Sequence, residues 1–403
     1  MFNHVNFPSL TYFVFLIILV AFFVFPLFSK SKATNGCYGK KYKYPLLLDW
    51  TIVVPCLIYA FLFGFRYNFG YDWDQYFYTF QYIQKGTLFR DTTEIGYLFI
   101  NRFIGFCGGN IYTLFIFEGF MWVISLCLLF KNDRKKLHII IPLFIMITWF
   151  RVLNLSRQHF AMSFFFIALS MLLDGKTKRY LFWSIIAASI HSSVLLFAVP
   201  FFLLYRLNIS VPSLKKILSC YGLIVIAKSA LTNVLLSLGT FFTVYLITNK
   251  DYSMSALLSD KFQWETSVSK MMMWIFIDVV SIIGIRRLIS QIKINEIGKK
   301  YVPEYYMLCL GLIGAILRPL GECHEIFSRT FFYFTYFEYL GFAMWIYYLL
   351  KKFKSKEIPL WLKMASVAAL CYVFYSFIFG LQYHVENGNY IEYIVGGDTF
   401  YNP

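Results

Sequence analysis

Two ionisable residues lie in apolar runs, where such residues are costly to place. Arg157 begins the run Arg-Gln-His-Phe-Ala-Met-Ser-Phe-Phe-Phe, and His191, followed by two serines, interrupts the run that leads to Phe197. An ionisable side chain at membrane depth costs several kcal/mol unless it faces a polar cavity, so it indicates a functional site. The planar guanidinium of arginine suits phosphate oxygens. We therefore expect Arg157 to bind an anion, and we treat His191 as a second functional residue.

Arg151 is a candidate to share this anion. It lies six residues before Arg157, a spacing that on one helix places the two side chains within about 120° of each other. Snorkelling of Arg151 to the membrane interface is the alternative.

A second polar group lies between two later apolar spans. Arg318 and Arg329 enclose Glu322 and His324, together with a proline and a glycine that we expect to break the helix there. Either arginine is a candidate anion ligand, and Glu322 and His324 are candidate sugar-binding residues.

Carboxylates gather after the second apolar run. Asp72 and Asp74 follow Arg66 closely, and Glu94 precedes the next apolar run. Paired acids can divide acid and base work when their surroundings separate their pKa values. A solvated loop is the alternative, and the sequence does not say which carboxylate matters more.

The same segment is rich in aromatic residues. Tyr71, Trp73 and Tyr76 alternate with the acids. An aromatic belt at the membrane interface is one interpretation. A sugar-binding surface is the other, because aromatic faces stack on sugar rings while carboxylates accept hydroxyl hydrogens.

Long apolar runs must position all of these residues. Of the 403 residues 59% are hydrophobic and 14% charged, far from the roughly 25% charged residues of soluble domains. The runs predict an all-α, polytopic integral membrane protein that forms a single transmembrane helical domain over residues 1–403. About twelve helices are expected, with nine to thirteen compatible with the runs. The expected helices are 10–28, 46–65, 110–130, 137–150, 155–173, 180–205, 217–228, 231–247, 271–285, 305–317, 330–350 and 359–380.

The net charge of +16 comes largely from short loops. Of the 37 Lys and Arg residues, 21 lie in the segments 30–43, 131–136, 176–179, 286–300 and 351–356. Positively charged loops stay in the cytoplasm, so this pattern argues against nucleic-acid binding. The same pattern places both termini, the segments 66–94 and 318–329, and the tail 381–403 on the outer side of the membrane.

Three regions are less regular. The basic segment 206–216 should be cytoplasmic by its charge, yet a single crossing by 180–205 would place it outside. Lys228 divides 217–247 into two short helices or one long broken helix. Residues 95–105 suit an amphipathic helix on the outer surface.

Other charges within spans look structural. We expect Glu118, Asp278 and Glu338 to pair across helices. The sequence has no phosphate-binding glycine-rich loop and no metal-ligand spacing, so we expect neither a cofactor nor a metal.

Together these pieces resemble the EpsG family of bacterial exopolysaccharide proteins, grouped with Wzy-type O-antigen and capsule polymerases. The resemblance rests on five pieces that span roughly residues 50–340. They are Arg66 with Gly70, Asp72 and Tyr76; Glu94-Ile-Gly-Tyr; Arg157-Gln-His-Phe-Ala-Met-Ser; Ala187–Ser193; and Ser328-Arg329 with Tyr333.

The resemblance implies a polymerase in the bacterial inner membrane. It would join undecaprenyl-pyrophosphate-linked oligosaccharide units at the outer face, possessing a fold similar to the GT-C glycosyltransferase class. Arg157 and Arg329, helped by Arg318, Arg151 or Arg66, would neutralise the pyrophosphate. An acid or histidine would deprotonate the sugar hydroxyl, with Asp72, Asp74, Glu94 and His191 as candidates. Membrane lipids, a chain-length regulator and a flippase are the implied partners.

Two other functions fit a chain of this kind. A lipid-linked oligosaccharide flippase should show two related halves and charge along a path from both sides. A membrane O-acyltransferase should carry polar groups toward the cytoplasm. The sequence shows no convincing repeat, and its acidic residues are skewed outward.

Overall fold

The fold is predominantly helical. The computed structural model describes residues 4–5, 8–32, 41–42, 45–67, 69–70, 72–87, 93–207, 211–239, 268–292, 303–323, 325–386 and 392–394. Four of its helical segments are long and apolar enough to cross a membrane: Thr11–Phe28, Ile111–Leu129, Arg134–Asn154 and Leu360–Tyr383. The helical membrane class is thus confirmed, whereas the count of about twelve crossings is not.

The chain divides into two compact units, Met1–Val194 with Val373–Pro403, and Leu195–Tyr372. The sequence predicted one domain. Hydropathy reports that a span is apolar but not which spans pack together, so it does not reveal this division.

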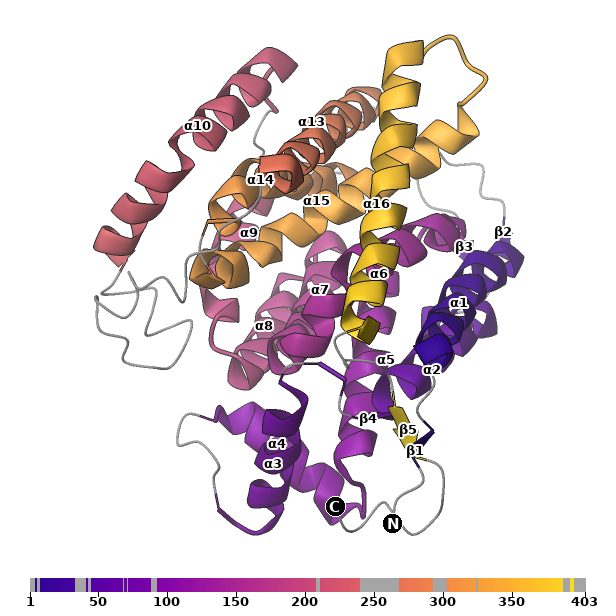
Figure 1. The fold of residues 1–403 in the computed structure, drawn as a ribbon, viewed down its shortest axis with the longest axis vertical. Helices are drawn as coiled ribbons and strands as arrows, with labels where there is room; N and C mark the ends of the chain where they lie inside the picture. The colour runs from indigo at the N-terminus through magenta and orange to yellow at the C-terminus, as the bar shows by residue number, and fades with distance from the viewer. Residues whose placement is uncertain are drawn as a thin grey trace. The chain divides into compact units, whose positions relative to one another are not determined.

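The first unit contains the N-terminal helices and short strands (Figure 1). Its helices are α1 Pro8–Val24, α2 Trp50–Gly64, α3 Trp73–Gln84, α4 Ile95–Phe106, α5 Ile111–Leu129, α6 Leu137–Asn154, α7 Ser156–Leu173 and α8 Thr177–Ile190. Its strands are β1 His4–Val5, β2 Ser31–Lys32, β3 Lys41–Tyr42, β4 Arg66–Tyr67 and β5 Glu392–Ile394. Short 3-10 turns at Phe25–Phe28, Leu46–Leu48 and Arg134–Lys136 connect some of them.

The second unit contains α9 Val194–Arg206, α10 Leu214–Gly239, α13 Val268–Gln291, α14 Pro303–Gly321, α15 Glu325–Lys351 and the first part of α16 Leu360–Glu386. Helices α14 and α15 form its tightest pair, because Gly314 and Gly311 lie against the backbone of Phe334 and Phe337. Small residues permit this close approach between membrane helices.

The core of the first unit is aromatic. Trp149 of α6 contacts Phe15 of α1 and Tyr59 and Phe63 of α2 edge to face, with ring centroids 4.3, 5.6 and 6.0 Å away. Edge-to-face geometry is favourable for such rings. This cluster fixes α1 and α2 against α6.

A buried polar network ties the opposite ends of the same helices. The carboxylate of Asp49, which caps α2, accepts hydrogen bonds from Ser29 (2.6 Å), Thr51 and Arg134 (2.6 Å). Burial alone would raise the pKa of Asp49, but these donors outweigh it and lower that pKa. Arg134 belongs to a predicted cytoplasmic loop, so the network anchors that side of the unit.

Both chain ends meet the segment after α2. Strand β5 pairs antiparallel with β1, matching His4 with Ile394, and with β4, matching Arg66 with Tyr393. The three-stranded order is β1-β5-β4. Residues 4–5 and 392–394 therefore lie beside the Arg66 turn.

The predicted helix 180–205 is wrong. Helix α8 ends at Ile190, His191 has extended backbone (φ −151°, ψ 118°), and α9 begins at Val194. The backbone N–H and hydroxyl of Ser193 bond to Nδ1 of His191 at 3.3 and 2.8 Å, and such local bonds compete with helix formation. His191 thus lies at a helix end and not within a span.

Because α8 ends at Ile190, residues 180–205 are not one continuous crossing, and the charge of segment 206–216 predicts the cytoplasmic side. Within the second unit, Nε of Arg286 donates to the carbonyl of Pro212 (3.1 Å), and the hydroxyl of Tyr306 donates to the carbonyl of Phe201 (2.6 Å). Arg286 lies near the end of α13, at the start of the predicted basic segment 286–300, so Pro212 lies beside that end of α13.

Other boundaries also differ from the prediction. Residues 214–239 form one helix, in which Lys228 donates to the sulfur of Met271 (3.1 Å). The predicted loop 66–94 contains α3. Helix α14 continues through Pro319 to Gly321, so it does not break at the proline. Segment 95–105 is helical as expected. Its exposed side carries Ile95, Phe99, Phe103 and Phe106, which suits the membrane surface.

The position of Pro212 can be tested by cysteine labelling. In a cysteine-free background, Pro212→Cys and Lys356→Cys should react with an impermeant maleimide only after the inner membrane is permeabilised, whereas Lys85→Cys should react in spheroplasts. These outcomes follow from the contact between Pro212 and Arg286. Labelling of Pro212→Cys in intact spheroplasts would place segment 206–216 outside.

Candidate functional site

The first turn of α7 contributes to a partly buried charge pair. Nη1 of Arg157 lies 2.8 Å from Oε2 of Glu94, and the two side chains are 25% and 11% exposed. The guanidinium also lies 5.8 Å from the ring centre of Tyr97. Only one guanidinium nitrogen is engaged in this ion pair, so the rest of the planar fork is available to a second anion.

Tyr76 connects α3 to the same turn. Its hydroxyl accepts a hydrogen bond from the backbone N–H of Arg157 (3.4 Å) and donates to the carbonyl of Asn154 (3.5 Å). Burial raises the pKa of Tyr76. Tyr76 therefore positions α3 against α7, although the sequence proposed it for sugar stacking.

Glu94 is held by the packing of α4. Glu94 directly precedes α4. Gly96, in the first turn of α4, lies so close to Ser189 of α8 that a Cβ atom added to Gly96 would be 2.7 Å from the Ser189 carbonyl oxygen. Gln84 of α3 donates to the carbonyl of Asn101 (2.8 Å), which joins α3 to α4. Rigid elements therefore hold the carboxylate facing Arg157.

A second buried acid lies behind the pair. Glu118 of α5, only 3% exposed, accepts a hydrogen bond from the hydroxyl of Ser156, the neighbour of Arg157. The expected pairing of Glu118 across helices is confirmed, since Ser156 belongs to α7. Its other oxygen has no hydrogen-bond partner among the described residues, so Glu118 retains an acceptor site.

His191 is linked to α7 by a short chain of hydrogen bonds. The amide of Gln158 donates to the Ser193 hydroxyl (3.4 Å), and Ser193 in turn bonds to Nδ1 of His191. Because the Ser193 backbone N–H donates to Nδ1, a neutral ring must carry its proton on Nε2. His191 is thus fixed in tautomer and orientation by residues of the site itself.

Several predicted residues have structural roles here. Arg66 is 1% exposed, donates to the carbonyls of Phe63 (2.6 Å) and Phe69 (3.3 Å), and stacks on Phe63 and Phe115. Trp73 is 3% exposed and donates to the Arg66 carbonyl (3.3 Å). The two side chains fix the turn before α3. These buried positions do not fit the contact with pyrophosphate predicted for Arg66 or the contact with sugar predicted for Trp73.

The acids of α3 differ in exposure. Asp72 is half-buried at the start of α3, and Asp74 in its first turn is exposed. Tyr71 and His324 lie outside the described residues. The roles predicted for these four side chains stay predictions.

Arg151 and Arg157 do not share a helix. Arg151 belongs to α6, and the chain bends at Leu155 (φ −112°, ψ 43°) before α7 begins. The 120° relation between them was therefore wrong. Arg329 lies half-buried in the first turns of α15, in the second unit, and its role as a pyrophosphate ligand stays a prediction.

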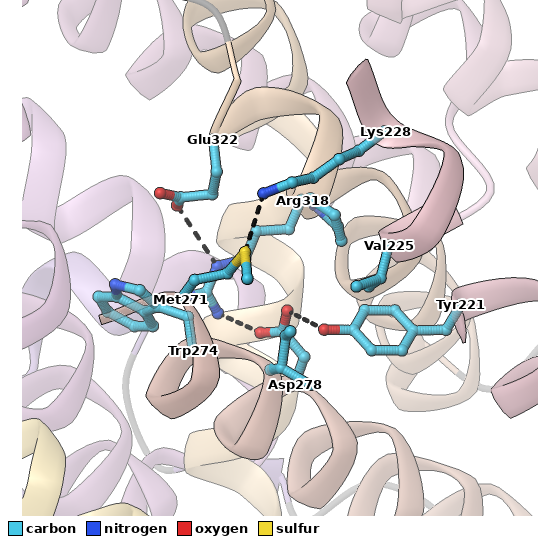
Figure 2. A pocket seen from close by; sticks show the side chains of 10 residues that line it. Tyr221, Val225, Lys228, Met271, Trp274, Asp278, Arg318 and Glu322 are labelled. Carbon is cyan, nitrogen blue, oxygen red and sulfur yellow. Dashed lines mark hydrogen bonds and ion pairs between the residues drawn. The ribbon is translucent and has the colours of Figure 1, made fainter. Parts of the chain in front are cut away.

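The second unit has its own charge cluster around Arg318 of α14, which is 3% exposed (Figure 2). Its Nη1 pairs with Asp278 of α13 and, at 3.3 Å, with Glu338 of α15, while its Nε lies 3.9 Å from Glu322. The guanidinium also stacks over Trp274 at 4.0 Å. Tyr221 of α10 donates to Asp278 (2.7 Å).

This cluster pairs charges across helices, as expected for Asp278 and Glu338. Three carboxylates surround one guanidinium, so a pyrophosphate at Arg318 would meet strong like-charge repulsion. The adjoining cavity, about 20 Å³, has room for about one water molecule. The predicted anion role of Arg318 and the sugar role of Glu322 do not fit this geometry.

Sequence reasoning did not single out Ser156 and Tyr97, which contact Glu118 and Arg157. Ser156 and Tyr97 carry no charge, and polar uncharged residues are ordinary in membrane helices. The signal that pointed to them was adjacency, since Ser156 precedes Arg157 and Tyr97 completes Glu94-Ile-Gly-Tyr.

Gly96→Ala should loosen the site. The new methyl group would clash with the backbone of Ser189, at a cost of about 1–3 kcal/mol, and would displace α4 with Glu94. The measurement is the thermal unfolding midpoint of the purified protein in detergent. Gly222→Ala is the matched control, because nothing lies within 4 Å of the position that its added methyl group would take. An unchanged midpoint for Gly96→Ala would show that α4 does not depend on this contact.

Arg318→Ala should destabilise the whole protein. Removing the guanidinium leaves Asp278 and Glu338 buried without their counter-ion, which costs about 3–5 kcal/mol. We expect loss of folded protein from membranes, measured by fluorescence-detected size exclusion. The triple variant that combines Arg318→Leu with Asp278→Asn and Glu338→Gln should recover much of the folded protein. A well-folded but inactive Arg318→Ala protein would instead support the anion-binding role predicted from the sequence.

The comparison with known proteins identifies a family. No curated protein and no solved structure matched the chain, so the expected similarity to the GT-C class gains no support. The EpsG family profile matches residues 49–395, which is most of the sequence. This match includes Glu94, Arg157 and His191, and it confirms the resemblance seen in the sequence. The chain belongs to the EpsG family, a family of Wzy-type polymerases.

Proposed function

We propose that this protein polymerises undecaprenyl-pyrophosphate-linked oligosaccharide units into O-antigen, capsule or exopolysaccharide at the outer face of the bacterial inner membrane. The observation that carries the proposal is the Arg157–Glu94 pair. It joins an anion-binding group to a candidate base at 2.8 Å, with the Arg157 side chain one quarter exposed. Family membership supports the polysaccharide assignment.

The reaction needs two groups from the protein. The bond between the anomeric carbon and the pyrophosphate oxygen breaks, and the lipid pyrophosphate departs with the electron pair. A hydroxyl oxygen of the acceptor sugar attacks that carbon and loses its proton to a base. Pyrophosphate is a good leaving group, so it needs charge neutralisation more than protonation. Arg157 supplies the positive charge, and a carboxylate accepts the proton.

The ion pair couples these two tasks. In the resting site, the Glu94 carboxylate is engaged by Arg157. An arriving pyrophosphate carries more negative charge than one carboxylate and competes for the planar guanidinium. As Arg157 turns to the phosphate oxygens, Glu94 is released to accept the hydroxyl proton. The base becomes active only when the donor is bound.

The other candidates take supporting positions in this scheme. His191, oriented by Ser193 and Gln158, is the second candidate base, followed by Asp72 and Asp74. Arg329 remains the predicted second ligand of the pyrophosphate, and Arg151 an auxiliary one. A flippase and a chain-length regulator would act before and alongside the reaction.

Arg157 variants test the proposal in a strain deleted for this gene. Arg157→Ala should abolish the polymer ladder on gels of surface glycan, because the pyrophosphate loses its counter-charge. Arg157→Lys should restore it only partly, since a point charge lacks the two-pronged contact. Arg102→Ala is the control, because Arg102 is an exposed arginine of α4. Membrane levels of each variant are measured by immunoblot.

The pattern of remaining glycan separates the alternatives. A single repeat at the surface means that export continues while polymerisation is lost, which supports the proposal. Absence of even that repeat would indicate a flippase. A normal ladder with altered decoration would indicate an acyltransferase. Glu94→Gln should match Arg157→Ala, and a normal ladder from Glu94→Gln would transfer the role of base to His191 or the α3 acids.

A further inference from the structure

The second unit contains an apolar cavity that the proposed polymerase site does not use. Its volume is about 420 Å³, and it lies between the end of α9, the first turns of α10 and the face of α14. Apolar side chains from all three helices line it, among them Leu204, Ile217, Leu310, Ile313 and Ile316. This volume and this lining are typical of a ligand-binding pocket.

The mouth of the cavity is cationic. Lys216 is a lining residue with an exposed side chain, and Lys215 beside it is also exposed. Pro212, another lining residue, accepts the hydrogen bond from Nε of Arg286. The positive charges of Lys216 and Arg286 therefore lie near Pro212, beside the end of α13.

We propose that this cavity binds an anionic phospholipid, with an acyl chain among the apolar side chains and the phosphate at Lys216 and Arg286. An apolar interior favours a hydrocarbon chain over water. The cytoplasmic leaflet is rich in anionic lipid, and basic pockets between membrane helices bind its head groups. The inference is independent of the polymerase proposal.

Two cysteines of the chain offer a direct readout. Cys220 and Cys309 both line the cavity, and neither forms a disulfide. Cys309 is partly exposed, so a small thiol reagent can reach it through the empty cavity. An acyl chain in the cavity would block that path.

The experiment uses full-length protein whose cysteines other than Cys309 are replaced by serine or alanine. The protein is reconstituted into nanodiscs of dioleoylphosphatidylcholine with or without dioleoylphosphatidylglycerol. The rate of Cys309 alkylation is measured, and retained lipid is identified by native mass spectrometry. We expect dioleoylphosphatidylglycerol to slow alkylation and to remain bound in preference to the zwitterionic lipid.

Charge variants test the head-group contact. Lys216→Glu should reduce retention of dioleoylphosphatidylglycerol at least about fivefold, given the attraction of one basic residue for an anionic surface. Lys356→Glu changes another exposed lysine, one that does not line the cavity, and should leave retention unchanged. Equal retention of both lipids, an equal loss with Lys356→Glu, or recovery of a polyprenyl phosphate in place of the phospholipid would overturn the proposal.

Discussion

The cost of keeping charge inside a membrane helix governs both units of this protein. A buried ion must be neutralised by a partner or reach water. Arg318, 3% exposed, satisfies this with carboxylates from two further helices and an aromatic ring. Among the described residues, Arg157 pairs with one carboxylate, that of Glu94, and its side chain is one quarter exposed. The first arrangement leaves no charge for a ligand and holds helices together. The second is neutral at rest yet able to exchange its anion, which is what a substrate site requires.

The first turn of α7 organises the candidate site because consecutive helical residues point about 100° apart. Ser156 bonds to Glu118 of α5, Arg157 pairs with Glu94 beside α4, and Gln158 bonds to Ser193 beyond α8. Three adjacent residues thus fix three other elements. Such an arrangement tolerates little movement, and the close contact of Gly96 with Ser189 supplies the necessary rigidity on the α4 side.

The two charge clusters were visible in the sequence to different degrees, for a physical reason. Arg157 was singled out because charge within an apolar run is conspicuous, and Glu94 because it precedes such a run, but their pairing was not predicted. The partnership of Arg318 with Asp278 was hidden, because pairing across helices depends on packing that hydropathy does not encode. Asp278 and Glu338 were correctly expected to pair, but Arg318 was separated from them and assigned to the substrate. The helix break at His191 was missed because its cause is a local bond to Ser193, and serine is also common within membrane helices.

The helix break at His191 limits how far α8 can extend across the membrane. Helix α8 has 14 residues, which corresponds to about 21 Å, whereas the hydrocarbon core of a bilayer is about 30 Å thick. If its basic start at Lys176 and Lys178 lies at the cytoplasmic surface, its end at His191 does not reach the opposite surface. Either the bilayer thins there or a polar recess extends down to His191. A recess is the arrangement that suits a donor whose pyrophosphate is joined to a lipid tail. In the proposed reaction, the lipid tail would remain in the hydrocarbon while the head group enters from the outer side, where the Arg157 and His191 side chains would meet it.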